Sequence, residues 1–381
     1  MTAILPQTDR PATRRPPLIA GAAPRSGGVA LILATRPEIF KLAPVLCRLG
    51  RRARVVRPGN HSPSALPNPE FGGGTGTGSR SFRVAGALEQ LTRLFAADRP
   101  EVVLVHGATD TALAGALAAH SHGIPLVHVE AGLRSHDLAL PEERNRVLAD
   151  RVSDVLCAPT PVEVGNLEAE GLGGRDVRLT GTTTAEAVHH RLMPGPDRIN
   201  VLRKWGLQPD GYVLATLDRP ENTDDEEALF AIANQLSGIA DAGYPVVLPV
   251  DPRTRAAVIR AGVLASAMNL RVVNRLWHSE FLALAKHAAL LVSDSGSVQE
   301  EATVLKRPIL VVRRSTERPE VLRDFGKLVR PHDDIAGIAL NWLTDGVECR
   351  ARLADTPSPF GDGRSSERIA DAVHHLSLLN R

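Results

Sequence analysis

Short apolar segments alternate with longer amphipathic segments along most of this chain. Apolar segments such as residues 101–105, 125–129 and 246–250 have the length and composition of buried strands, and the segments between them have helical spacing. Strands that alternate with helices form a parallel sheet that is covered on both faces. The chain has too many of these strands for one ordinary open sheet. We therefore predict an α/β fold with two doubly wound domains that face a central cleft.

Composition and turn residues indicate where the domains begin and end. Residues 1–27 are rich in Pro, Arg, Gly and Ala and lack periodicity, so we predict a disordered tail. The two halves are expected to join near residues 181–200, where Pro194, Gly195 and Pro196 interrupt the pattern. This places the first domain at 28–185 and the second at 186–363. The C-terminal helix, 364–381, is expected to pack back on the first domain.

The composition excludes several classes of protein. The 381 residues are 43% hydrophobic, which is enough for two cores, and the formal net charge is only +2. This charge gives no reason to expect nucleic acid or an anionic membrane surface as a partner. The sequence also has no apolar run of membrane-spanning length and no secretory signal. The three cysteines are widely separated and form neither a disulfide framework nor a metal-ligand pattern. We therefore expect a cytoplasmic protein without a metal.

The stretch 288–305 carries the strongest local signal. An apolar segment ends in the small polar turn S-D-S-G-S, residues 293–297, and a helix-compatible segment follows at once. A helix that begins here directs free backbone N–H groups and its positive end at the turn, which makes a site for a phosphate. Glu301, about one turn into the helix, is placed to accept hydrogen bonds from ribose hydroxyls. The alternative is an ordinary helix that is capped by Ser295.

Polar loops follow most of the predicted strands. In doubly wound sheets ligands bind beyond the carboxyl ends of the strands, so these loops are candidate walls of the cleft. Together they carry arginines and carboxylates, which indicates an anionic ligand and proton-transfer chemistry. The loops are 35–38, 106–111, 130–134, 218–222, 251–253, 293–297 and 313–318. A glycine-rich loop at 59–81 has no P-loop lysine, and we interpret it as a mobile loop.

Several motifs in these loops make the chain similar to a known family. They are A-T-R-P-E-I-F-K-L-A-P (34–44), H-V-E-A-G-L-R-S (128–135), P-E-E-R-N-R (141–146), S-D-S-G-S-V-Q-E-E-A (293–302), T-E-R-P-E (316–320) and F-G-D-G (360–363). In this order, and over residues 28–375, they closely resemble the UDP-N-acetylglucosamine 2-epimerase family. The resemblance implies a fold of the glycosyltransferase-B type, with two Rossmann-like domains of which the second binds the nucleotide. We also expect a homodimer.

The resemblance implies a reaction as well. Non-hydrolysing members of the family convert UDP-N-acetylglucosamine to UDP-N-acetylmannosamine by eliminating UDP and adding it back after C2 is reprotonated on the other face. This reaction needs no metal or redox cofactor, but it needs acid–base groups at C2 and cationic groups for the diphosphate. Matching the motifs makes Glu130 and Glu142 the acid–base carboxylates. The residues expected to bind the UDP-sugar are Arg36, Lys41, His61, Arg146, Ser295, Gly296, Ser297, Glu301 and Arg318.

Three catalytic or binding positions depart from the family pattern. Where the family has the aspartate of G-D-T, this chain has Ala108, and a methyl group does not transfer a proton. Asp110, two residues later, is a candidate replacement if the turn is rebuilt. Asp218 and Asp251 stand where the family has histidines. We assign Asp218 to the catalytic set and Asp251 to the substrate-binding set, because carboxylates bind sugar hydroxyls and amines.

These departures leave three interpretations open. The chain is an epimerase, and so an isomerase, with a rearranged acid–base set. Alternatively it is a diverged enzyme of the same fold that acts on another nucleotide sugar or a glycoside by hydrolysis, elimination or glycosyl transfer. The third interpretation is a nucleotide-sugar binding protein without catalysis. The intact phosphate motif favours a nucleotide-sugar ligand in each of them.

Overall fold

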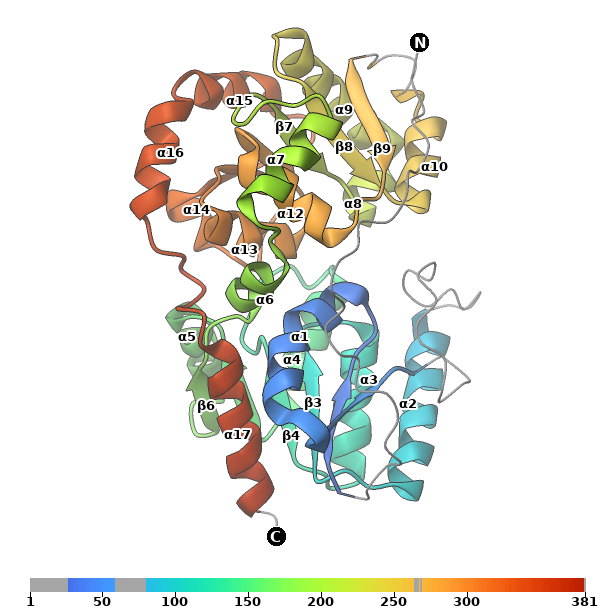
Figure 1. Ribbon diagram of the computed structural model, residues 1–381. Coiled ribbons are helices and arrows are strands. Elements are labelled where there is room, and N and C mark those ends of the chain that lie inside the picture. Colours follow the sequence, from blue (N-terminus) through green and yellow to red (C-terminus); the bar gives the residue numbers. More distant parts are fainter. Residues whose placement is uncertain (1–26, 59–79, 264–266, 268, 380–381) are drawn as a thin grey trace.

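The computed structural model describes residues 27–58, 80–263, 267 and 269–379. The predicted tail and most of the glycine-rich loop lie outside these residues, as does His61. Figure 1 shows two lobes, one above the other, and each lobe is built on its own sheet. The chain passes between the lobes at α6 (Thr184–Arg191) and returns between α16 (Gly346–Asp355) and α17 (Ser365–Leu379).

Each sheet has six parallel strands whose order reverses direction near its middle. The first sheet has the order β2-β1-β3-β4-β5-β6, and the second has the order β12-β11-β10-β7-β8-β9. Such sheets confirm the predicted α/β fold with two Rossmann-like units. The strands of the first sheet are β1 Val29–Ile32, β2 Ala53–Val56, β3 Val102–His106, β4 Leu126–Val129, β5 Val155–Ala158 and β6 Asp176–Leu179. Those of the second are β7 Val213–Thr216, β8 Val246–Val250, β9 Leu270–Asn274, β10 Leu290–Ser293, β11 Ile309–Val312 and β12 Gly326–Val329.

Helices cover both faces of each sheet, as the alternation of strands and helices requires. In the first lobe they are α1 Arg36–Leu49, α2 Arg80–Ala97, α3 Asp110–Ser121, α4 Pro141–Val152 and α5 Pro161–Ala169, with a short 3-10 turn at Gly50–Arg52. In the second lobe they are α7 Gly195–Lys204, α8 Pro220–Thr223, α9 Glu226–Asp241, α10 Pro252–Arg260, α12 His278–His287, α13 Gly296–Leu305, α14 Val321–Asp324 and α15 Ile335–Thr344.

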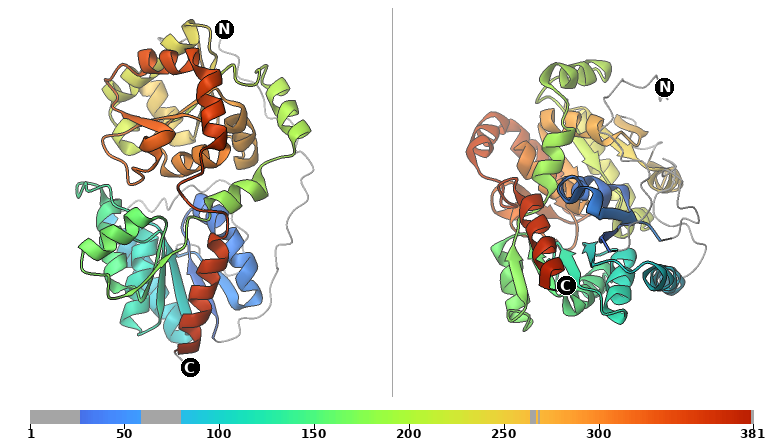
Figure 2. Two further views of the ribbon diagram at one scale, coloured as in Figure 1. Left: turned by 90° about the vertical axis from the view of Figure 1, so that its left-hand side faces the viewer. Right: turned by 60° about the horizontal axis from the view of Figure 1, so that its bottom comes forward.

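The last helix belongs to the core of the first lobe. Ile369 and Val373 on α17 are fully buried and lie in one apolar cluster with Val29 and Leu31 of β1. Both views in Figure 2 place α17 along the first lobe, far from the rest of the C-terminal sequence. The C-terminal end of the chain therefore completes the first lobe, although it follows the second lobe in the sequence.

The carboxyl ends of the strands bring the polar loops together. The register of β3 and β4 pairs His106 with Val129, so that Gly107 and Glu130 begin neighbouring loops at one edge of the sheet. The Gly107 amide donates to the Val129 carbonyl at 2.9 Å and holds these loops side by side. Within the described residues, no helix is both long and apolar enough to cross a membrane.

Candidate active site

Glu130 lies at the centre of the polar side chains in the first lobe. It follows β4 with a φ of 65°, a left-handed backbone conformation that is uncommon outside glycine and often marks functional residues. Lys41 on α1 donates to Glu130 Oε1 at 2.6 Å, and His106 Nε2 lies 3.2 Å from the same oxygen. Burial alone would raise the pKa of the Glu130 carboxyl, but Lys41, His106 and Arg318 hold that pKa well below its ordinary value. Glu130 is therefore ionised in this structure.

Arg318 carries the charge network into the second lobe. Its Nε donates to Glu300 Oε1 at 2.5 Å and its Nη1 donates to Glu317, and its Nη2 lies 3.5 Å from Glu130 Oε2. Lys41 also reaches across the cleft, with its Nζ 3.1 Å from Glu300 Oε2. We call Lys41, Glu130, Glu300, Glu317 and Arg318 the bridging cluster. All five side chains are buried, so the cluster joins the lobes through ion pairs that are shielded from water.

The start of α13 lies against the bridging cluster. Ser295 occupies the N-cap position, but within the described residues its side chain makes no capping hydrogen bond to the helix. A methyl group at Gly296 would lie 2.6 Å from Arg318 Nη1 and 2.8 Å from Glu317 Oε1, so any larger residue would displace these side chains. The positive end of α13 and the Arg318 guanidinium therefore converge on one point, beside Ser297, where an anion would be stabilised.

Glu301 lies one residue beyond the cluster on α13. It is buried, and its carboxylate accepts a hydrogen bond from His278 Nε2 at 2.8 Å. The imidazole of His278 stacks on Phe40 of the first lobe with ring centroids 5.3 Å apart. Glu301 is thus anchored near the cleft, one helix turn from the anion-binding end of α13.

Glu142 and Arg146 on α4 face the second lobe from the other side. Arg146 Nη1 donates to Glu143 at 2.9 Å, and its Nη2 lies 3.7 Å from Glu317 of the bridging cluster. The Glu142 carboxylate is half-buried. Its negative charge raises the pKa of the Arg219 guanidinium in the second lobe and so opposes the larger lowering by burial. Arg146 is therefore one of four arginines around Glu317, with Arg219, Arg313 and Arg318, while Glu142 does not join the bridging cluster.

Asp218 lies near two other aspartates, Asp294 and Asp251. Asp294 Oδ1 accepts from the Asp218 amide at 3.1 Å and Asp294 Oδ2 from the Asn222 side chain at 3.0 Å, so Asp294 shapes the loop after β7. Burial, Asp294 and Asp251 raise the pKa of Asp218 to about 6. Asp251 caps α10 by accepting from the Thr254 amide at 2.7 Å. The structure thus gives Asp251 a structural role in addition to the predicted contact with substrate.

Asp110 lies apart from Glu130 and its partners. Its Oδ1 accepts from Arg80 Nε at 2.8 Å and from the Asn145 side chain at 3.1 Å. Asn145 also donates to the Ala108 carbonyl at 2.9 Å, which fixes the turn between β3 and α3. Asp110 therefore forms an ion pair with Arg80 of α2. To replace the carboxylate that is missing at position 108, Asp110 would need a different conformation of this turn.

Two predicted residues have no described side chain. Arg36 is the first residue of α1, so its backbone lies at the cleft end of β1, but its side chain lies outside the described part of the structure. His61 lies outside the described residues altogether. Their predicted contacts with substrate remain predictions.

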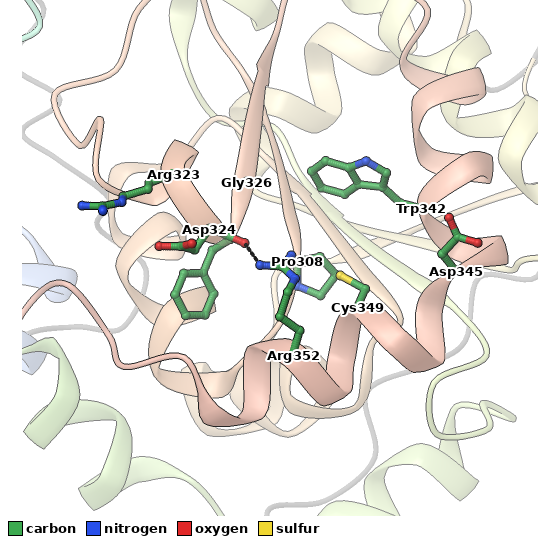
Figure 3. Close-up of a pocket in the computed structure, with 9 residues that line it drawn as sticks. Pro308, Arg323, Asp324, Gly326, Trp342, Asp345, Cys349 and Arg352 are labelled. Atoms are coloured by element: carbon green, nitrogen blue, oxygen red, sulfur yellow. Dashed lines mark hydrogen bonds between the residues drawn. The ribbon is translucent and has the colours of Figure 1, made fainter.

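One cavity lies away from all of these residues. It has a volume of about 330 Å³ and opens on the second lobe between α14, α15 and α16. Figure 3 shows Trp342, Cys349 and Arg352 around it, with Arg352 donating to the Asp324 carbonyl. None of the predicted site residues lines this cavity. The candidate active site is therefore placed at the bridging cluster, where polar loops of the two lobes meet.

Comparison with known proteins identifies the family. The family model described as UDP-N-acetylglucosamine 2-epimerase matches residues 64–374, which is most of the chain. The chain belongs to this family. The resemblance drawn from the motifs is thereby confirmed, and with it the isomerase class.

Individual members of the epimerase family agree over almost the full length. The UDP-N-acetylglucosamine 2-epimerase of Methanococcus maripaludis is 33% identical over 362 residues, which cover 91% of this chain and 98% of that protein. The crystal structure of the Methanocaldococcus jannaschii enzyme in complex with UDP-GlcNAc and UDP has a TM-score of 0.76 at 31% identity, covering 91% of this chain and 99% of that one. The UDP-2,3-diacetamido-2,3-dideoxy-D-glucuronate 2-epimerase of Pseudomonas aeruginosa is 31% identical over 315 residues, covering 82% and 85%. These comparisons confirm the glycosyltransferase-B type of fold.

Three residues of the epimerase site were absent from the set predicted by sequence. Glu300 and Glu317 hold Arg318, and His106 lies beside Glu130. Glu300 falls inside the motif 293–302, Glu317 lies in the loop after β11, and His106 is the last residue of β3, so the position of each was available in the sequence. Their partners come from distant segments, and the sequence does not indicate which residues these are.

A second contact between the lobes predicts a pH effect on stability. The Thr160 hydroxyl lies 2.6 Å from Glu163 Oε2 on α5 and 2.5 Å from Glu320 Oε1 of the second lobe. Burial and the nearby Glu320 charge raise the pKa of Glu163 from 4.5 to about 7. Because the folded-state pKa is the higher one, the folded chain binds the extra proton. The resulting stabilisation is complete below about pH 4.5 and is lost as the pH rises through about 7.

We therefore expect Glu163→Gln to stabilise the protein at pH 8 but not at pH 5. Glutamine keeps the side-chain oxygen that accepts from the Thr160 amide at 2.9 Å and removes the charge. The gain in the free energy of unfolding at pH 8 should be roughly 1–3 kcal/mol, measured by thermal or urea unfolding. Glu168→Gln, an exposed change on the same helix, is the control. Equal effects of Glu163→Gln at both pH values would contradict a raised pKa.

Proposed function

We propose that this chain converts UDP-N-acetylglucosamine to UDP-N-acetylmannosamine by inverting C2 of the sugar. The observation that carries the proposal is the position of the Glu130 carboxylate beside Arg318, whose guanidinium lies at the start of α13. A general base and an anion site thus lie together in one cleft. Membership of the epimerase family supports the same reaction.

The cationic groups of the cleft suit a diphosphate. We place the diphosphate at residues 295–297, where backbone N–H groups and the positive end of α13 meet Arg318, with Arg146 close by. Glu301, which already accepts from His278, is placed to accept from ribose hydroxyls. Lys41 on α1 holds Glu130 in place, and Arg36, the first residue of the same helix, is proposed to bind the substrate. Arg318 would bind the diphosphate while Glu300 and Glu317 hold its guanidinium in position.

The reaction balances in two halves. In the first, a base removes the proton from C2, the electron pair forms the C1–C2 double bond, and the C1–O bond breaks with its pair going to the UDP oxygen. In the second, an acid delivers a proton to the opposite face of C2 while the UDP oxygen bonds to C1 again. Glu130 and Glu142 are proposed as the acid–base groups, and the cationic site stabilises the departing UDP.

A second candidate is the same chemistry on another UDP-sugar. Asp218 has a pKa raised to about 6, so its carboxyl takes up a proton more readily than an ordinary aspartate does. A sugar with additional hydroxyl or amino groups would find partners in Asp218 and Asp251. The similarity to an epimerase named for a diacetamido sugar is consistent with variation of the sugar within this family. The homodimer and the assignment of 186–363 as the nucleotide-binding domain also remain proposals.

Product analysis tests the proposed reaction. The chain is incubated with UDP-N-acetylglucosamine, and nucleotide sugars, UDP and free sugars are separated by chromatography. We expect UDP-N-acetylmannosamine without accumulation of UDP. Accumulation of UDP and free sugar would indicate hydrolysis, and binding without any product would indicate another UDP-sugar or a binding protein.

Restoring a carboxylate at position 108 should accelerate this reaction. Ala108 lies in the loop after β3 next to Gly107, whose α-carbon faces Glu130 Oε2. Because a positioned acid–base group typically contributes about 10²- to 10⁴-fold, Ala108→Asp should raise kcat by about tenfold or more. Ala97→Asp, at the exposed end of α2, is the control. An unchanged kcat in Ala108→Asp would show that position 108 does not limit turnover.

A further inference from the structure

His106 is a buried titratable residue to which the proposed reaction assigns no role. It is the last residue of β3, and only 5% of its surface is exposed. Its Nε2 lies 3.2 Å from Glu130 Oε1, the oxygen that also accepts from Lys41. His106 therefore lies beside the carboxylate at the centre of the candidate active site.

The ring nitrogens of His106 have no hydrogen-bond partner within the described residues. His128, on the neighbouring strand β4, shows the usual arrangement of a structural histidine. Its Nδ1 lies 2.6 Å from Asp150 Oδ1 and its Nε2 lies 3.0 Å from the Gly107 carbonyl. Because buried polar groups are almost always hydrogen-bonded, His106 is the histidine of this pair that has capacity left for a ligand or a moving proton.

The other candidate proton carriers near Glu130 are engaged or absent. Asp110 is held by Arg80 and Asn145, and Ala108 carries no ionisable group. Glu130 itself is surrounded by positive charge, which lowers the pKa of its carboxyl. His106 Nε2 is a ring nitrogen without a hydrogen-bond partner in the described residues, and it lies 3.2 Å from Oε1 of this carboxylate.

We propose that His106 relays the proton that Glu130 takes from C2 of the sugar. The inference rests on the proposed function and assigns a positioning and relay role within the same site. In the forward step the C2–H bond breaks, the proton reaches Glu130 Oε1, and the electron pair forms the C1–C2 double bond as UDP departs. The proton then moves from Glu130 Oε1 to His106 Nε2, which leaves Glu130 ionised and His106 positively charged. In the reverse reaction the proton returns along the same path.

Substitution of His106 tests the relay. His106→Gln and His106→Ala are compared with the native chain and with His120→Gln, an exposed histidine on α3 of the same lobe. Each protein is first checked for cooperative thermal unfolding and for UDP affinity by calorimetry. We expect both His106 variants to lose about 10²- to 10⁴-fold in kcat for epimerisation of UDP-N-acetylglucosamine, with KM and the UDP Kd changed less than about threefold.

Added imidazole separates a relay from a purely structural role. It should restore part of the kcat of His106→Ala, which has room for it, and should not affect His120→Gln. A native kcat in either variant, or a loss confined to KM, would overturn the relay and leave the proposed function intact. A native chain that binds the nucleotide sugar but exchanges no hydrogen at C2 would overturn both the proposed function and the relay.

Discussion

Replacing Glu130 with glutamine is expected to lower the kcat for epimerisation by about 10²- to 10⁴-fold, the usual contribution of a positioned general base. The amide keeps the size of the side chain but neither accepts a proton from C2 nor forms ion pairs with Lys41 and Arg318. The affinity for UDP should change little or increase, because a negative charge near the diphosphate is removed. Steady-state kinetics and calorimetry with UDP measure the two effects separately.

An exposed glutamate supplies the control for this change. Glu89→Gln on α2 alters an ion pair with Arg93 at the surface and should leave kcat unchanged. If Glu130→Gln retains native turnover, Glu130 is not the base. If it loses UDP affinity in proportion to its activity, its role is to organise the anion site.

Removing Arg318 is expected to damage both binding and stability. Arg318 pairs with Glu300 and Glu317, which are 0% and 2% exposed. Arg318→Ala leaves Glu300 paired with Lys41 and Glu317 paired with Arg313, so the loss of unfolding free energy should not exceed the cost of about 3–5 kcal/mol that is typical for removing one partner of a buried ion pair. The lost charge-assisted contact with the diphosphate should weaken UDP binding by about 1.5–3 kcal/mol, or roughly 10- to 150-fold.

The same loop contains a matched control for Arg318. Arg314 is exposed, and Arg314→Ala should change neither UDP affinity nor unfolding by more than about 0.5 kcal/mol. Arg318→Lys keeps a charge but loses the fork that reaches several carboxylates at once, so it should recover stability only in part. Native UDP affinity in a folded Arg318→Ala variant would place the diphosphate elsewhere.

The fold was largely predictable because its central strands are strongly apolar. The strand at 246–250 was predicted with the bounds that the structure has. The strands β5, β6 and β12 were not predicted. Sequence D-V-R-L of β6 is half polar and lies at a sheet edge, as does G-K-L-V of β12, so neither has the apolar pattern of a central strand. Strand β5 has only four residues, which is too short for a clear period.

From the sequence, the site could be predicted only as the set of loops that follow the strands. The rule that ligands bind beyond the carboxyl ends of strands selected the loops that contain Glu130, Ser295 and Arg318, and the structure brings these together. The same rule also selected the loop with Asp110, although Asp110 forms its ion pair with α2 and not with the residues around Glu130. Contacts between residues far apart in sequence, such as that between Lys41 and Glu300, depend on how the two lobes meet. A single sequence carries no local signal for such contacts.

Hydrogen exchange at C2 of the sugar tests the central claim most directly. The chain is incubated with UDP-N-acetylglucosamine in deuterated water, and the C2 proton is followed by NMR. We expect deuterium to enter C2 of both the substrate and UDP-N-acetylmannosamine, because every passage through the double-bonded intermediate removes the original proton. Binding of UDP-N-acetylglucosamine with no deuterium at C2 would contradict the assignment of this cleft as the site of C2 epimerisation.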